Sequence, residues 1–137
     1  MILSTASIAA NAAAYSGYCG SGLTWSYNSS TGKLTISGRG DMYDYSQDSV
    51  PWAEYREIIQ SVTLVNGVTS VGDYAFYDIT HTNSFTLSNT LQHIGDYAFA
   101  DSQIQTIDLN QVKTIGNGAL RGAKFSSIII PGTVTKI

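Results

Sequence analysis

The sequence is poor in the residues that most catalytic and metal sites require. Its 137 residues include one cysteine, Cys19, and two histidines, His81 and His93. One thiol cannot form an internal disulfide, and two separated histidines with one cysteine match no zinc-ligand spacing. No nucleophile elbow or other ordered motif surrounds the many serines. We therefore expect no enzyme activity, no metal site and no cofactor, with both histidines exposed and Cys19 buried as a small apolar side chain.

Charge is also scarce. Only 12% of the residues are charged, the net charge is −3, and there is no run of lysine or arginine. Proteins that bind nucleic acid or anionic lipid electrostatically carry basic patches, so neither partner is expected. No apolar run reaches the roughly 18 residues that suggest a membrane-spanning helix, and no membrane span is expected in this piece.

What the sequence has is internal repetition. The hexapeptide Val-Gly-Asp-Tyr-Ala-Phe at 71–76 returns as Ile-Gly-Asp-Tyr-Ala-Phe at 94–99 and, weakened, as Ile-Gly-Asn-Gly-Ala-Leu at 115–120. From the first glycine to the second is 23 residues, and from the second to the third 21. This period is typical of solenoids in which each repeat forms one turn.

Each repeat also contains an apolar-x-apolar strand pattern, which places both apolar residues on one face of a strand. We expect these strands to stack in parallel about 4.8 Å apart and to turn their apolar side chains inward. A further apolar layer precedes each glycine, and the β-branched final turn is expected to self-associate through its uncovered edge. The first strand positions are Val62, Phe85, Ile107 and Ile128, the second are Leu64, Leu87, Leu109 and Ile130, and the further layer is Val71, Ile94, Ile115 and Ile137.

Each part of the hexapeptide has its own expected role. Glycine permits a corner, and the Asp or Asn after it is expected to N-cap a short helical turn. Alanine lets neighbouring turns approach each other, and phenylalanine fills the space between them. Thr82 replaces an apolar residue in a connection that is one residue longer than its equivalents, so the second turn is expected to bulge.

The N-terminal part has a different pattern. Residues 1–16 are expected to be a signal peptide, truncated at its basic end, or a disordered tail, because small apolar residues include Ala-x-Ala sites. Alternating segments at 23–27 and 33–37 predict a β-hairpin, residues 38–50 a loop, and residues 51–59 a short helix beginning at a proline. Residues 17–57 are therefore expected to cover the first turn of the repeats as an N-terminal cap.

The repeats resemble those of the BspA-like leucine-rich repeat family, whose units carry an Ile-Gly-x-x-Ala-Phe corner. Segments 19–25, 33–42 and 51–52 also resemble the leader that often precedes those repeats. The resemblance implies a β-rich fold with a minor α component: a right-handed leucine-rich-repeat-like solenoid with a parallel strand ladder. The β-hairpin cap would occupy 17–57, and about three and a half repeats, the last incomplete, would occupy 58–137. The resemblance further implies a secreted or cell-surface adhesion protein without enzymatic activity.

The outward strand positions are the candidate binding surface, which we call the strand face. Rows of hydroxyl groups on a rigid strip can hydrogen-bond an extended partner, although a merely soluble sheet face would look the same. The strand face comprises Ser61, Thr63, Ser84, Thr86, Thr106, Asp108, Ser127 and Ile129.

Two other candidates lie in the expected loop and the start of the helix expected after it. Arg39, Gly40 and Asp41 form the tripeptide that integrins recognise, or else a leader turn with two charged neighbours. Acidic residues at 41, 44, 48, 54 and 57 form either a cation site or a solvated surface.

Two functions therefore remain open. The first is a secreted or surface-displayed module that binds a host protein or glycan, and the second is a structural spacer or intracellular scaffold with no ligand of its own.

Overall fold

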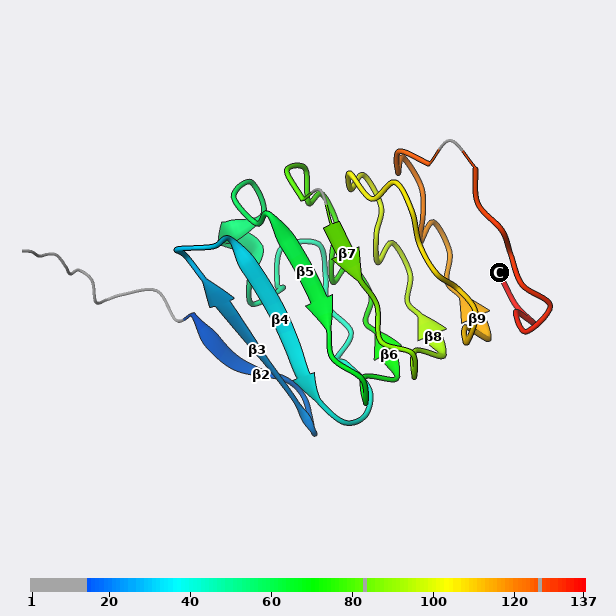
Figure 1. Ribbon diagram of the computed structural model, residues 1–137, viewed down its shortest axis with the longest axis horizontal. Helices are drawn as coiled ribbons and strands as arrows, with labels where there is room; N and C mark the ends of the chain where they lie inside the picture. Colours follow the sequence, from blue (N-terminus) through cyan, green and yellow to red (C-terminus); the bar gives the residue numbers. More distant parts are fainter. Residues whose placement is uncertain (1–14, 83, 126) are drawn as a thin grey trace, which may run out of the picture.

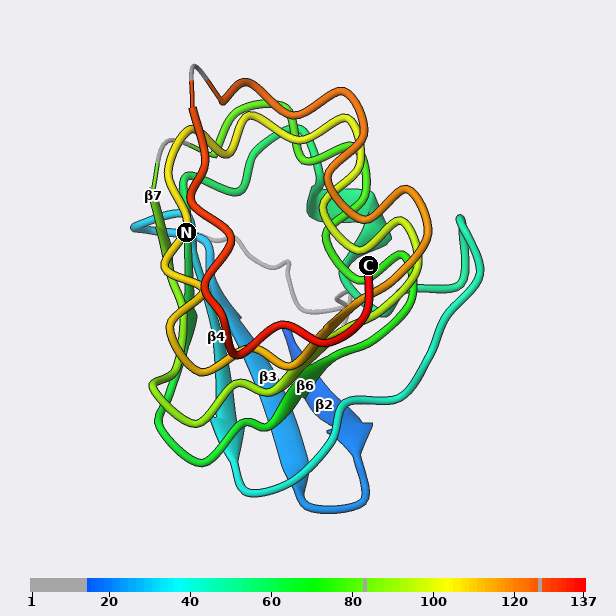
Figure 2. The same ribbon diagram turned by 90° about the vertical axis from the view of Figure 1, so that its right-hand side faces the viewer.

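The computed structural model describes residues 15–82, 84–125 and 127–137. This part of the chain consists of β-strands and turns with one short 3-10 helix, η1 (Ala53–Tyr55). Successive turns follow one another along the long axis (Figure 1), and in the end-on view they overlie one another around a common interior (Figure 2). The β-rich fold is as expected.

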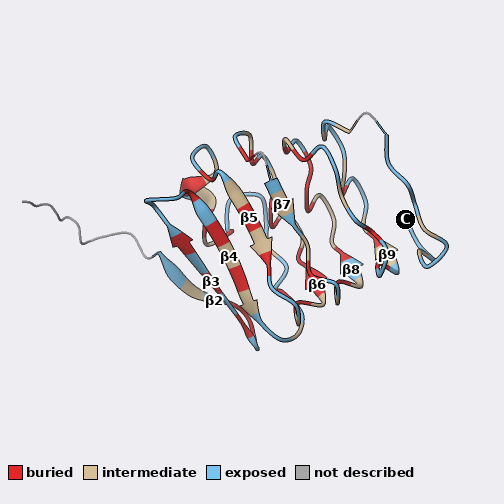
Figure 3. Ribbon diagram, in the orientation of Figure 1, coloured by how far each residue is buried: buried red, intermediate tan, exposed pale blue. Residues whose placement is uncertain are grey.

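The larger sheet has five strands, in the order β2 (Ser16–Gly20), β3 (Leu23–Asn28), β4 (Lys33–Gly38), β5 (Ser61–Leu64) and β7 (Ser84–Thr86). The first three strands are antiparallel, whereas β4–β5 and β5–β7 are parallel. Strand β3 alternates buried and exposed residues (Figure 3), and Trp25 lies opposite Ile36. This confirms the expected hairpin; β2 was not expected.

The smaller sheet contains the row of residues that precede each glycine. Its parallel strands are β6 (Ser70–Val71), β8 (His93–Ile94) and β9 (Thr114–Ile115). Ser70 pairs with His93 and His93 with Thr114, and an isolated bridge continues this row to Lys136. The expected register of the apolar layer is therefore confirmed for Val71, Ile94 and Ile115, whereas Ile137 is 71% exposed.

The interior is built on a column of aromatic rings. Phe76 and Phe99 are fully buried and stacked, with centroids 5.5 Å apart, and the alanines before them are buried as well. Trp52 extends the column by one ring, 5.7 Å from Phe76, and donates a 2.8 Å hydrogen bond from Nε1 to the carbonyl of Ala75. The roles expected for alanine and phenylalanine are confirmed. The segment before the repeats adds the ring of Trp52 to the column.

We had expected the aspartates of the corners to N-cap short helical turns, but they do not. Each carboxylate instead accepts a hydrogen bond from a backbone N–H of the following turn. Asp73 Oδ1 accepts from Asp96 N at 2.7 Å, and Asp96 Oδ1 from Asn117 N at 2.8 Å. Asp44 begins this series by accepting from Asp73 N at 3.0 Å. The aspartates therefore join successive turns.

The acidity of Asp73 provides a test of this arrangement. Burial raises the pKa of its carboxyl group, and the hydrogen bond from Asp96 only partly offsets that effect. A carboxyl whose pKa is higher in the folded state loses stabilising free energy as pH rises through that folded pKa. The replacement Asp73→Asn removes the charge but keeps a side-chain oxygen that can accept the hydrogen bond. Asparagine already occupies the equivalent position two turns later, at Asn117.

We expect the melting temperature of Asp73→Asn to exceed that of the wild type by a margin that grows between about pH 4 and about pH 7. Differential scanning calorimetry at a series of pH values measures this margin. A margin that is constant, or that shrinks as pH rises, would contradict the role assigned to the buried charge.

Two expectations need correction. The helix expected over 51–59 is only the three-residue η1. The strand ladder stops at β7, so Ile107 and Ile128 lie outside the strands. Phe85, in the last strand of the ladder, packs edge-on against Phe76 and Phe99.

Thr82, in the connection expected to bulge, is buried rather than displaced. Its hydroxyl donates a 2.9 Å hydrogen bond to the carbonyl of Ile59. A buried hydroxyl without such a partner would be costly, so this bond explains how threonine replaces an apolar residue there.

Residues 1–14 of the expected signal peptide or tail lie outside the described residues, whereas Ser16 begins β2 and Tyr15 lies 6.3 Å from Tyr27 between ring centroids. Within the described ranges, no helix has the length and apolarity needed to cross a membrane.

Candidate functional site

The strand face begins as two regular rows of hydroxyl groups on β5 and β7. Ser61 lies opposite Ser84, and Thr63 lies opposite Thr86, in parallel register. The two residues of β7 are exposed and the two of β5 are half-buried. Four expected members of the strand face are thus side by side on paired strands.

The other four members are exposed but do not continue the ladder. Thr106, Asp108, Ser127 and Ile129 lie outside the strands, and Ile129 is 85% exposed. The structure therefore joins the first half of the strand face and leaves the second half as irregular surface.

The break after β7 creates a seam of hollows beside the hydroxyl rows. One hollow of 410 Å³ lies between Thr86 and Leu87 on one side and Thr106 and Asp108 on the other. A second, of 190 Å³, is lined by Ser84, Phe85 and the segment 104–106. Among the described residues, no backbone hydrogen bond joins β7 to this neighbouring segment.

This arrangement offers two kinds of polar group to a partner. Serine and threonine hydroxyls can each donate and accept hydrogen bonds, and the open edge of β7 has unpaired backbone groups. An extended segment added to such an edge gains main-chain hydrogen bonds, with pockets for its alternate side chains. The geometry therefore suits an extended polar partner.

The integrin-type tripeptide is held in the fold. Gly40 forms a parallel bridge with Val68, donating from its N–H to the carbonyl of Gly67 at 3.0 Å. The Asp41 carboxylate accepts a 2.6 Å hydrogen bond from the Thr69 hydroxyl. Arg39 and Asp41 are exposed, but the backbone between them is fixed beside the smaller sheet.

The acidic residues of the expected loop are engaged separately. Asp41 is bonded to Thr69, Asp44 accepts from Asp73 N, and Asp48 forms a 3.5 Å ion pair with Arg56. Across the part of the chain that the structure describes, no three His, Cys, Asp or Glu side chains are grouped in a way that could hold a metal ion.

Cys19 and the two histidines lie as expected. Cys19 is fully buried, and burial raises the pKa of its thiol to about 12, so the reactive thiolate is scarce at neutral pH. His81 and His93 are exposed and belong to different turns. His93 Nδ1 lies 2.7 Å from Thr114 Oγ1 within the smaller sheet.

A group of tyrosines was not singled out from the sequence. Tyr74 and Tyr97 stack with ring centroids 5.2 Å apart, and Tyr77 meets Tyr74 edge-on. The recurrence of tyrosine 23 residues apart, at the position that follows each corner aspartate, was the available signal.

A comparison with family models identifies the type of repeat. A sequence profile described as "BspA type Leucine rich repeat region (6 copies)" matches residues 54–137. No curated protein matches the chain.

Two solved structures are similar. One is the crystal structure of a leucine-rich repeat protein from Eubacterium ventriosum ATCC 27560, with 29% sequence identity and a TM-score of 0.75 over 89% of this chain and 39% of that chain. The other is a leucine-rich repeat protein from Bacteroides capillosus ATCC 29799, with 15% identity and a TM-score of 0.46 over 87% of this chain and 100% of that chain. The chain thus spans 39% of the length of the first of these proteins.

Proposed function

Because the chain belongs to the BspA-type leucine-rich repeat family over residues 54–137, we propose that it is a non-enzymatic binding module of a secreted or cell-surface protein. Its partner in this proposal is a host protein or glycan, contacted through the strand face. Rigid repeat surfaces commonly serve as extended binding sites.

One observation carries this proposal: the exposed hydroxyls of β7 border both the hollows and an unpaired strand edge. Ser84 and Thr86 lie at the last paired strand of the larger sheet, beside hollows of 190 and 410 Å³. A partner segment placed along β7 would therefore meet side-chain and backbone hydrogen-bonding groups together.

The replacements Ser84→Arg and Thr86→Arg test the strand face. Each would place a long charged side chain over the seam, and we expect binding to plates coated with mammalian extracellular-matrix extract to weaken at least about tenfold. Melting temperatures should stay close to that of the wild type because both positions are exposed.

Ser46→Arg is the matched control. Ser46 is exposed in the loop before η1, which lies on the opposite side of the end-on view from β7 (Figure 2), so this variant should bind like the wild type. Equal binding by all three arginine variants would contradict the strand-face proposal. Loss of binding only in Asp41→Ala would instead support the integrin-type tripeptide at 39–41.

Weak binding by every variant and by the wild type would favour the second function, a spacer or scaffold without its own ligand. The rows of hydroxyls would then serve only to keep the sheet soluble. Locating the native protein by cell fractionation separates a surface module from an intracellular scaffold.

We propose the finer architecture as a right-handed solenoid of about three and a half turns, with residues 17–57 as its N-terminal cap and 58–137 as its repeats. The parallel pairings of β4 with β5 and of β6, β8 and β9 support it. A crystal structure in which the crossovers run left-handed, or in which residues 17–57 leave the first turn uncovered, would contradict it.

A further inference from the structure

A second polar and aromatic surface lies at the corners of the turns. A hollow of 270 Å³, which we call the tyrosine notch, is lined by Gln47, Tyr77, Tyr97, Ala100, Asp101 and Arg121, with Tyr74 at its side. It shares no lining residue with the hollows beside β7. Whatever binds there would not compete directly for the strand face.

The register of the turns explains why a notch exists. Tyr77, Ala100 and Arg121 occupy one position in three successive turns, as shown by hydrogen bonds from Asp78 N to Ala100 O and from Asp101 N to Arg121 O, of 2.9 and 2.7 Å. Two long side chains therefore stand about 10 Å apart along the stack, with a buried alanine between them. That spacing leaves room for one six-membered ring above Ala100.

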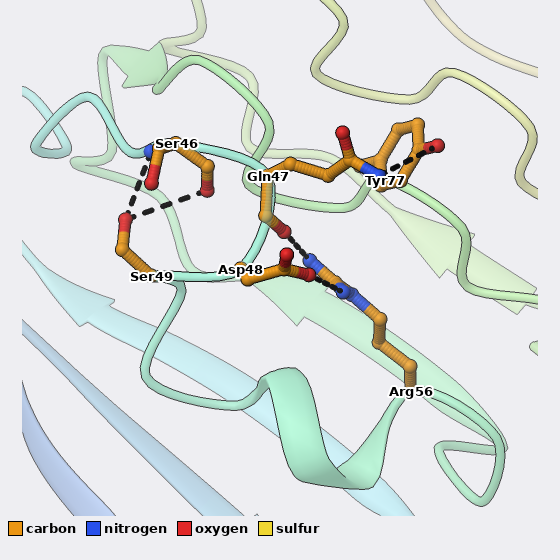
Figure 4. A network of polar contacts seen from close by, with 6 residues as sticks. All are labelled: Ser46, Gln47, Asp48, Ser49, Arg56 and Tyr77. Atoms are coloured by element: carbon orange, nitrogen blue, oxygen red, sulfur yellow. Dashed lines mark hydrogen bonds and ion pairs between the residues drawn. The ribbon is translucent and has the colours of Figure 1, made fainter.

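The tyrosine wall of the notch is fixed by its surroundings (Figure 4). Gln47 Nε2 donates to the Tyr77 hydroxyl at 3.3 Å, and the Arg56 guanidinium lies 5.6 Å from the Tyr77 ring centroid. Arg56 is held in turn by the ion pair with Asp48 and by a hydrogen bond to the carbonyl of Gln47. A wall that is ordered before binding reduces the entropy lost when a ligand binds.

The side of the notch carries backbone strain. Tyr74 and Tyr97 have φ angles of 58° and 55°, in the left-handed region, whereas the third corner has glycine there, Gly118, with φ of 62°. This conformation costs roughly 1 to 2 kcal/mol for each non-glycine residue. One ring stack returns only about 0.5 to 1.5 kcal/mol. Strain of this kind tends to be kept at functional sites.

The charged groups of the notch are available to a ligand. Within the described chain, neither Asp101 nor Arg121 makes an ion pair or a side-chain hydrogen bond, and both are exposed. An acceptor, a donor and an aromatic ring thus face the same space.

We propose that the tyrosine notch binds a single pyranose ring of a glycan. The C–H face of the sugar would pack on the ring of Tyr77, while the Asp101 carboxylate accepts hydrogen bonds from sugar hydroxyls and the Arg121 guanidinium donates to them. A flat aromatic side chain would fit the same space but would leave these polar groups without partners. The sugar satisfies both the apolar and the polar parts of the notch.

Saturation-transfer difference NMR with the methyl pyranosides of glucose, galactose and mannose tests this proposal. We expect transfer to at least one of them, with a Kd on the order of 1 to 10 mM, and none to acyclic sorbitol. Ala100→Tyr should reduce the transfer about tenfold by filling the notch, since the equivalent position already holds tyrosine at 77. Arg121→Ala and Asp101→Asn, at exposed positions, should weaken it without loss of fold.

Thr86→Arg tests whether the tyrosine notch and the strand face bind independently, and it should leave sugar binding unchanged. The notch variants should likewise leave binding at the strand face unchanged. The proposal is overturned by an absence of transfer to all three pyranosides, by equal transfer to sorbitol, or by transfer that survives Ala100→Tyr and Arg121→Ala. Transfer to N-acetyltyrosinamide but to no pyranoside would overturn the sugar assignment in favour of an aromatic side chain.

Discussion

Replacing Phe99 by alanine is expected to lower the free energy of unfolding by about 3 to 5 kcal/mol. The side chain is fully buried, stacks on Phe76 and meets Phe85 edge-on at 5.5 Å. Its removal would open a cavity between two turns that are held by hydrogen bonds on either side, so the surroundings could collapse only partly. Urea denaturation followed by tryptophan fluorescence measures the loss.

His93→Ala is the comparison for Phe99→Ala. His93 is exposed and contributes one hydrogen-bonding contact to Thr114, so its loss should cost less than about 1 kcal/mol. Equal shifts of the urea midpoint in the two variants would show that the ring column is not the centre of the core.

Gly95→Ala is expected to destabilise the fold by about 3 kcal/mol or more, although it adds only one methyl group. A Cβ at this position would lie 2.5 Å from Asp73 Oδ1, 2.7 Å from Asp73 N and 2.8 Å from Gly72 C. Two of these atoms are backbone, and the third accepts the hydrogen bond that links the turns. The added methyl group would have to push two turns apart.

Gly132→Ala provides the matched control because its Cβ would meet no atom within 4 Å. Thermal unfolding of both variants by circular dichroism should show a large fall in melting temperature for position 95 and little change for position 132. A fall of similar size in both would mean that glycine is needed for chain flexibility rather than for close approach of the turns.

The interior of the repeats could be predicted from the sequence because its determinants are local and recur. The hexapeptide contains the small and the large residue of each corner, and Ala98 and Phe99 are buried as expected. The alternation of β3 and β4 likewise predicted the hairpin. These features need only the pattern of apolar residues.

The features that the sequence did not predict depend on partners in other turns. A glycine followed by aspartate favours local capping, but the partner of Asp73 is the N–H of Asp96, 23 residues later. Strand β2 shows no alternation in its sequence and forms because the edge of β3 is there to pair with. Trp52 joins the aromatic column through a contact with the next turn.

The candidate surfaces also combine features that a local sequence pattern predicts with features that depend on contacts between turns. The exposure of Ser84 and Thr86 could be predicted from strand alternation, whereas the hollows beside them are lined by residues of two successive turns. The tyrosine notch requires three turns in register, with alanine between tyrosine and arginine. Such a combination has no signature within one repeat.

Rows of backbone hydrogen bonds join each corner to the next, and this has a mechanical consequence. Tyr74, Phe76 and Asp78 donate to the turn that follows, as do Tyr97, Phe99 and Asp101. A pulling force applied to the end of the chain would load one such row at a time, so turns should peel off in sequence rather than rupture together. Each turn of about 22 residues would release roughly 75 Å of chain, which would let a tethered array lengthen under shear while its remaining turns stay folded.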